Sequence, residues 1–145
     1  MSDLDPLAPP AETSDGVSTV EVRTSASAAL IPTIRAVASD LAARADFDLD
    51  AISDLRMAVD EACATLVDVA APKSMLRCTF MVRPERIEVL AEVKAGRPDA
   101  AVSTDTFGWR VLQTLADEVE AKHFPGEDGP IVGIRLDKHS GDPTR

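Results

Sequence analysis

Few side chains in this sequence of 145 residues have the type and spacing that chemistry requires. Cys63 and Cys78 are the two cysteines, too few for a zinc site or for a disulfide framework. We expect buried free thiols, because free cysteine is among the most buried residue types. A regulatory disulfide is the alternative, and it requires the two thiols to come close in the fold. His123 and His139 are isolated in the sequence, and we assign them no role.

Glu61 lies beside the clearest helical pattern in the sequence. By pattern alone, an exposed helix carboxylate is the favoured interpretation of Glu61, because charged side chains are mostly exposed. Its neighbours predict one long helix from Ile52 to Val69, since apolar residues recur there at helical spacing. The apolar stripe of this helix consists of Ile52, Leu55, Val59, Ala62, Leu66 and Val69.

The chain is long enough for one domain with one core and too short for two. Residues 1–16 carry three prolines among small and acidic residues, which predicts a disordered tail. The folded domain is expected over residues 17–138, followed by a flexible polar tail over residues 139–145.

Periodicity along the domain predicts the order βααββαββ. Alternating apolar residues indicate strands from residue 17, over 76–82 and 87–93, and again over 119–124 and 131–137. Helices are expected from a cap at Ser27 through Leu41, over Ile52–Val69, and around Trp109 to Ala116. The sequence therefore predicts an α+β, two-layer sandwich. Its mixed, mostly antiparallel sheet of four or five strands carries three helices on one face, and the other face is polar.

Charge and composition exclude several functions. The net charge is −10, of which the first sixteen residues supply four acidic groups and no Lys or Arg, leaving −6. An acidic domain repels phosphate backbones, so we expect no direct DNA binding. It suits a basic partner, although plain solubility explains the charge equally well.

Aromatic residues make up only 3%, too few for base-stacking platforms. No apolar run is long enough to span a membrane and no leader is visible, so a cytoplasmic protein is expected.

Three segments, in this order of elements, resemble the Bergerat ATP-binding fold. Leu55–Thr65 is similar to the helix that carries the motif E-x-x-x-N, and Ile87–Gly96 is similar to the strand that runs into D-x-G. Gly108–Val119 is similar to G-x-G-L followed by a helix. Together they resemble the RsbW/SpoIIAB serine kinases that act as anti-sigma factors, over roughly Val17 to Lys138.

This resemblance implies ATP and Mg²⁺ as cofactors, and it gives some residues a role. Glu61 matches the general base of phosphoryl transfer. Thr65 stands where the family has the asparagine that ligates Mg²⁺, and its shorter hydroxyl arm reaches less far. Lys94 stands where an aspartate accepts a hydrogen bond from adenine, but an ammonium group only donates.

The phosphate-contacting glycines of the family are retained in part. Backbone amides approach phosphate only where side chains are missing. Thr106 replaces the first glycine of G-x-G, whereas Gly108 keeps the second and Gly96 keeps the glycine of D-x-G. The departures at Thr65, Lys94 and Thr106 predict nucleotide chemistry that is weak or lost.

The resemblance also implies partners. It predicts an anti-sigma factor that sequesters an alternative, stress-type sigma factor and is released by an anti-anti-sigma factor. The first helix would dock onto the sigma factor through Arg35, and the chain would form a homodimer. An active serine-protein kinase that phosphorylates its anti-anti-sigma factor is the alternative. A small interaction domain unrelated to this family is the third hypothesis.

Overall fold

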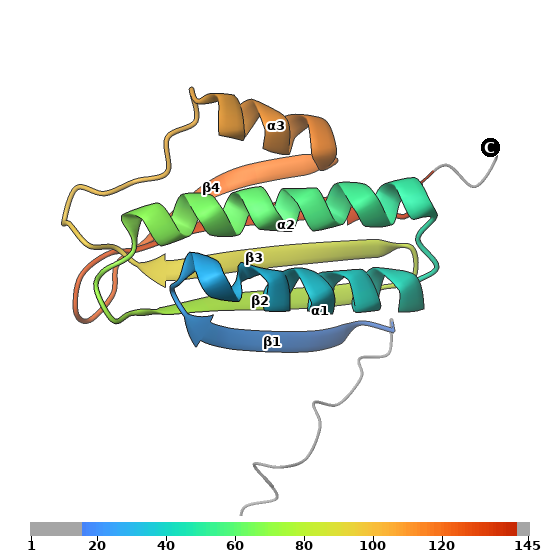
Figure 1. Ribbon diagram of the computed structural model, residues 1–145, viewed down its shortest axis with the longest axis horizontal. Helices are drawn as coiled ribbons and strands as arrows, with labels where there is room; N and C mark the ends of the chain where they lie inside the picture. Colours follow the sequence, from blue (N-terminus) through green and yellow to red (C-terminus); the bar gives the residue numbers. More distant parts are fainter. Residues whose placement is uncertain (1–15, 142–145) are drawn as a thin grey trace, which may run out of the picture.

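Eight helices and strands follow one another in the predicted order in the computed structural model, which describes residues 16–141 (Figure 1). The only addition is a short 3₁₀ turn, η1, over Ala28–Leu30. The elements are β1 (Ser18–Ser25), α1 (Ile31–Arg44), α2 (Leu49–Val69), β2 (Met75–Arg83), β3 (Arg86–Lys94), α3 (Phe107–Leu115), β4 (Glu118–Phe124) and β5 (Ile131–His139).

The strands form one five-stranded sheet in the order β1-β2-β3-β5-β4. Each of its four pairings is antiparallel, so the sheet contains no parallel pair among the described residues. The predicted hairpin is confirmed, because β2 and β3 pair up to Arg83 and Arg86 on either side of a two-residue turn. Glu85 in that turn has a φ of 62°, a left-handed conformation that tight turns require.

All three α-helices cover the same face of the sheet (Figure 1). The two-layer α+β prediction is therefore confirmed. Alternate strand residues point at the helices and form the core, as the period of two requires. Phe80 is the largest fully buried side chain among the described residues. Aromatic residues are scarce, so most of the remaining core is Ala, Val, Leu and Ile.

Local hydrogen bonds decide where the first two helices begin. Ser27 caps η1 and not α1, and its hydroxyl accepts from the Ala29 amide. Asp48 caps α2 by accepting from the Ala51 amide at 2.8 Å. The predicted single helix from Ile52 to Val69 is confirmed, and it begins three residues earlier because of this cap.

The domain ends later than the sequence predicts. His139 is the last residue of β5 and pairs with Arg86 on β3, so the tail expected from His139 onward was wrong at its start. Ser140 is buried and its amide donates to the Glu85 carbonyl at 2.9 Å. The polar side chains of His139 and Ser140 gave no strand pattern in the sequence. Their backbone groups nevertheless form hydrogen bonds, which do not depend on side-chain hydropathy. Of the expected tail over residues 1–16, only Gly16 lies within the described residues.

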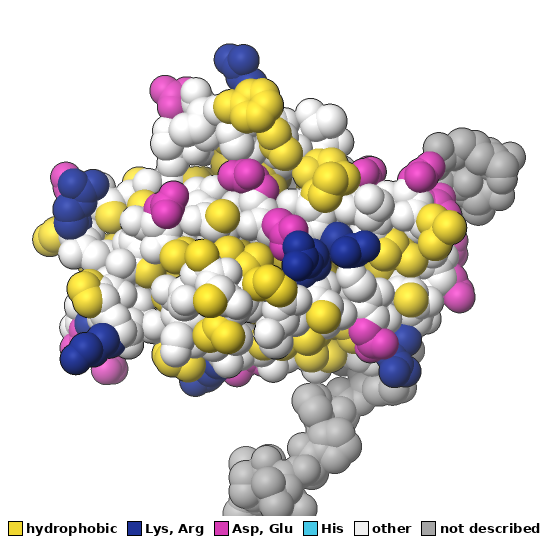
Figure 2. Space-filling model, viewed as in Figure 1, with side chains coloured by type: hydrophobic (Ala, Val, Ile, Leu, Met, Phe, Trp, Pro, Cys, Tyr) yellow, Lys and Arg dark blue, Asp and Glu magenta, His cyan; other side chains and the backbone are white. Residues whose placement is uncertain are grey.

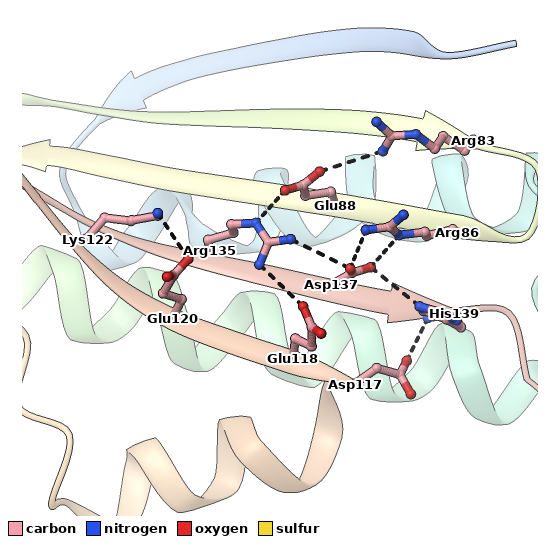
Figure 3. A network of polar contacts seen from close by, with 10 residues as sticks. All are labelled: Arg83, Arg86, Glu88, Asp117, Glu118, Glu120, Lys122, Arg135, Asp137 and His139. Carbon is pink, nitrogen blue, oxygen red and sulfur yellow. Dashed lines mark hydrogen bonds and ion pairs between the residues drawn. The ribbon is translucent and has the colours of Figure 1, made fainter. Parts of the chain in front are cut away.

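The open face of the sheet carries charged side chains that form a network of ion pairs (Figure 3). Arg86 on β3 binds Asp137 on β5 through two hydrogen bonds of 2.9 and 2.6 Å. Arg135 bridges Glu88 and Asp137, contacting Glu88 most closely. Burial of the Asp137 carboxyl raises its pKa, but the hydrogen bond and charge of Arg86, together with His139 and Arg135, outweigh burial. The pKa of Asp137 therefore lies below its ordinary value.

We expect Asp137→Asn to lower the free energy of unfolding at neutral pH by about 1–2 kcal/mol, because Arg86 loses a charged partner while remaining partly hydrated. The depressed pKa means that the stabilisation is present above the ordinary carboxyl pKa of 3.8 and disappears as the pH falls through the lower folded value. Urea denaturation from neutral pH to about pH 3 would measure this. Asp128→Asn, at an exposed turn position, is the matched control. An unchanged gap between wild type and Asp137→Asn across that range would contradict the assignment.

Candidate functional site

The surface formed by α1 and α2 contains the residue expected to contact a partner. The docking role expected of Arg35 calls for a side chain that faces solvent, and this side chain is 35% exposed. Its Nη1 donates to Oδ2 of Asp60 on α2 at 3.0 Å. Figure 2 shows acidic and basic side chains together on this helical face, so the acidity of the chain is not concentrated there. Arg35 therefore joins the two helices as well as facing solvent.

Glu61, Thr65 and Gly108 come together between α2 and α3. A Cβ atom added to Gly108 would lie 2.5 Å from Oε2 of Glu61, so the carboxylate fills the space that a side chain would occupy. The Thr65 hydroxyl lies 2.9 Å from the Glu61 carbonyl and 3.3 Å from Oε2. Glu61 is half-buried at the N-terminus of α3, where the helix dipole stabilises a negative charge.

Thr106 is the N-cap of α3. Its hydroxyl accepts a hydrogen bond of 3.0 Å from the Trp109 amide. A glycine at this position would leave that amide free to meet a phosphate, whereas the threonine satisfies it internally. Thr106 thus stabilises the helix start and takes a donor from any anion at this end.

Lys94 lies on the other side of the sheet from α2. Its neighbour Val93 is buried under the helices, and strand side chains alternate between faces. Lys94 is exposed and lines a hollow of the open face together with Arg23, Arg77 and Glu92. Arg77 already binds Glu92 at 2.7 Å, so Glu92 has a partner other than Lys94. Position 94 continues the polar face of β3 and does not point at Glu61.

Gly96 lies against the end of α2. Its amide donates to the Val69 carbonyl at 2.8 Å, and an added Cβ would lie 3.2 Å from the Ala70 carbonyl oxygen. This close approach explains the need for a glycine. Gly96 also lines a hollow of about 230 Å³ whose other walls are Asp68, Val69, Ala70, Arg97 and Ala100. None of Glu61, Thr65 and Gly108 lines this hollow.

The residues present do not fit ATP and Mg²⁺ in the arrangement that the resemblance implies. Three of the five expected positions meet, but the carboxylate of Glu61 occupies the space beside Gly108. The hydroxyl of Thr65 is turned along its own helix, and Lys94 faces away. Within residues 16–141, no group of three or more His, Cys, Asp or Glu side chains is placed to hold a metal ion.

Two features of this region were missed from the sequence. Asp60 had no role assigned, because it lies 25 residues from Arg35 in the sequence and no local pattern links the two residues. The cap formed by Thr106 was available as a pattern, since a threonine directly before an apolar helical run is an N-cap preference.

Comparison with known proteins agrees with this architecture. The model of the histidine kinase-like ATPase domain matches residues 24–136. The fold and the matched range thus define a histidine kinase-like ATPase domain. The anti-sigma-F factor RsbW of Mycobacterium tuberculosis, in strains CDC 1551 / Oshkosh and ATCC 25618 / H37Rv, is 35% identical over 125 residues. That alignment covers 83% of this chain and 73% of the relative. Within the ATPase-like class, the chain belongs to the RsbW-type anti-sigma factor family.

We expect the double substitution Thr65→Asn, Lys94→Asp not to create ATP binding, although it restores two letters of the family motifs. The reason is geometric: a carboxylate at position 94 would lie on the open sheet face, away from Glu61. Isothermal titration of wild type and the double variant with ATP and MgCl₂ measures this, with Lys73→Asp, at an exposed position between α2 and β2, as a charge-matched control. Micromolar affinity of the double variant would show that position 94 faces the nucleotide.

Proposed function

We propose that this protein is an anti-sigma factor that sequesters an alternative, stress-type sigma factor and is released by an anti-anti-sigma factor. In this proposal its nucleotide chemistry is weak or lost. The observation that carries the proposal is the 35% identity with the anti-sigma-F factor RsbW over most of both chains. That relative is named as an anti-sigma factor, and the family relationship supports the same role for the present chain.

The α1–α2 surface supports the proposal because Arg35 lies on it and is partly exposed. Arg35 is held at a defined position by Asp60, and about one-third of its side chain is exposed. A pre-positioned arginine loses little side-chain entropy when it binds a carboxylate or carbonyl of a partner. We place the sigma-binding surface here, around Arg35 on α1.

The altered nucleotide positions support a complex that does not depend on ATP. Thr106 satisfies an α3 amide, and Glu61 fills the space next to Gly108. None of these contacts touches Arg35, which lies on the other side of α2. In this proposal, partner binding at Arg35 does not require nucleotide.

An active serine-protein kinase is the second candidate, and one observation favours it. Glu61 keeps the general-base position and lies at the N-terminus of α3, the end of a helix that attracts phosphate. If this were the activity, Glu61→Gln would abolish transfer of radioactive phosphate from ATP to the anti-anti-sigma factor, whereas Glu61→Asp would retain part of it. We expect no transfer by the wild type.

The remaining properties follow from the family and the charge. We expect a homodimer, no direct binding to DNA, and a cytoplasmic location. Among the described residues, no helix is both long and apolar enough to cross a lipid bilayer. The net charge of −10 favours encounter with a basic partner, and this contribution should weaken as salt screens it.

We predict a stoichiometric complex with a sigma factor that forms equally well with and without ATP and Mg²⁺. Arg35→Glu should weaken it at least tenfold, because the substitution removes the donors and places a second carboxylate beside Asp60. Retention of purified sigma factors on immobilised protein at low salt, followed by calorimetry, measures the effect. Arg44→Glu, on the exposed last turn of α1, is the control for charge reversal on the same helix.

A charge swap separates direct contact from support of the helix pair. Arg35→Glu combined with Asp60→Arg restores the internal ion pair but reverses the charges presented to a partner. If Arg35 contacts the sigma factor, the double variant regains stability and not binding. Recovery of binding would assign Arg35 a structural role only. Failure of every sigma factor to be retained by the wild type would end the anti-sigma proposal.

A further inference from the structure

The two cysteines, far apart in sequence, meet in the core. Cys63 on α2 and Cys78 on β2 have their sulfur atoms 3.9 Å apart. Both residues are buried, with exposures of 1% and 0%. The contact joins the helix layer to the sheet, and among the described residues there is no other cysteine pair.

We propose that Cys63 and Cys78 are a site of oxidative modification, at which an intramolecular disulfide staples α2 to β2. A disulfide needs the sulfurs to approach from 3.9 Å to about 2 Å, a movement within reach of side-chain rotation and a small helix shift. The neighbour of Cys78 on β3 is the small Ala91, which leaves the Cys78 side chain uncrowded on that side.

The chemistry requires a two-electron oxidant, for which a peroxide suffices. One thiolate attacks the O–O bond, giving a sulfenic acid and hydroxide, which takes up the proton lost by that thiol. The second thiol attacks the sulfenic sulfur, the S–S bond forms and water leaves. In sum, two thiols lose two electrons and two protons, and one peroxide becomes two molecules of water.

Burial sets the rate of this reaction. The contact with Cys78 and burial raise the pKa of the Cys63 thiol, so the reactive thiolate is scarce in the closed domain. Oxidation therefore proceeds through transient opening of the helix layer and is slow under strongly native conditions. Once formed, the disulfide is equally shielded from thiol reductants. In a reducing compartment this makes it a response to sustained oxidation and not a permanent bond.

A staple at this position would hold the α1–α2 surface. Cys63 is one helical turn from Asp60, which binds Arg35, so a crosslink below α2 fixes the α2 side of this surface to the sheet. This consequence rests on the proposed anti-sigma function: the oxidised protein would keep its sigma-binding surface folded under oxidising stress. The disulfide itself depends only on the two thiols.

The first test needs no partner. Full-length reduced protein is incubated with hydrogen peroxide in urea just below its unfolding midpoint, then analysed by intact mass and peptide mapping. We expect a monomer lighter by two hydrogen atoms, with a peptide linking Cys63 to Cys78. Its urea midpoint should rise on the order of 1 M and fall back after treatment with dithiothreitol in urea that opens the domain. The single variants Cys63→Ala and Cys78→Ala, checked for wild-type circular dichroism, should show neither change.

The opposite results are equally clear. Disulfide-linked dimers, sulfinic acid at either cysteine, unreacted thiols throughout, or a lower urea midpoint after oxidation would each overturn the staple. A second measurement addresses function: oxidised protein should retain a bound sigma factor at a urea concentration that releases it from reduced protein. If the crosslink forms but reduced protein retains no sigma factor in plain buffer, the proposed function fails while the modification site stands.

Discussion

The packing of α2 against the sheet is the interaction on which the rest of the structure depends. This helix contacts α1, α3 and three strands, and its buried side consists largely of small and branched residues. Alanines at positions 51, 58 and 62 are buried on this side together with the larger Leu55 and Leu66. A bulkier side chain at any of these alanines would force the helix away from β2 and β3.

Because successive helix residues point about 100° apart, one turn of α2 addresses three different neighbours. Asp60 reaches α1 through Arg35, Glu61 reaches the start of α3, and Cys63 points down to β2. A small displacement of α2 would therefore change the Arg35–Asp60 contact, the contact of Glu61 with the start of α3, and the thiol contact together. The three contacts are chemically unrelated, but all of them depend on the position of α2.

The fold has been kept while the site it is known for has changed. Thr106 caps α3 where a glycine would leave an amide free, and Lys94 continues the polar face of β3. Both substitutions suit local structure, since a capped helix and a hydrated strand face are stable without a ligand. A fold does not by itself determine activity, so a change at the nucleotide positions leaves the surface of α1 and α2 structurally unaffected.

The sequence by itself determined the architecture, because each element carries its own periodic pattern. The stripe from Ile52 to Val69 predicted a helix, and the alternation on either side of Pro84 and Glu85 predicted a hairpin. Motif letters also indicated the family, and three residues that those motifs singled out, Glu61, Thr65 and Gly108, lie close together between α2 and α3. Tertiary structure alone decided which side chains meet across elements. It paired Arg35 with Asp60, turned Lys94 to the open face, and set Cys63 against Cys78. These contacts depend on helix rotation and strand register, which are fixed by the packing of the whole core and by no local pattern.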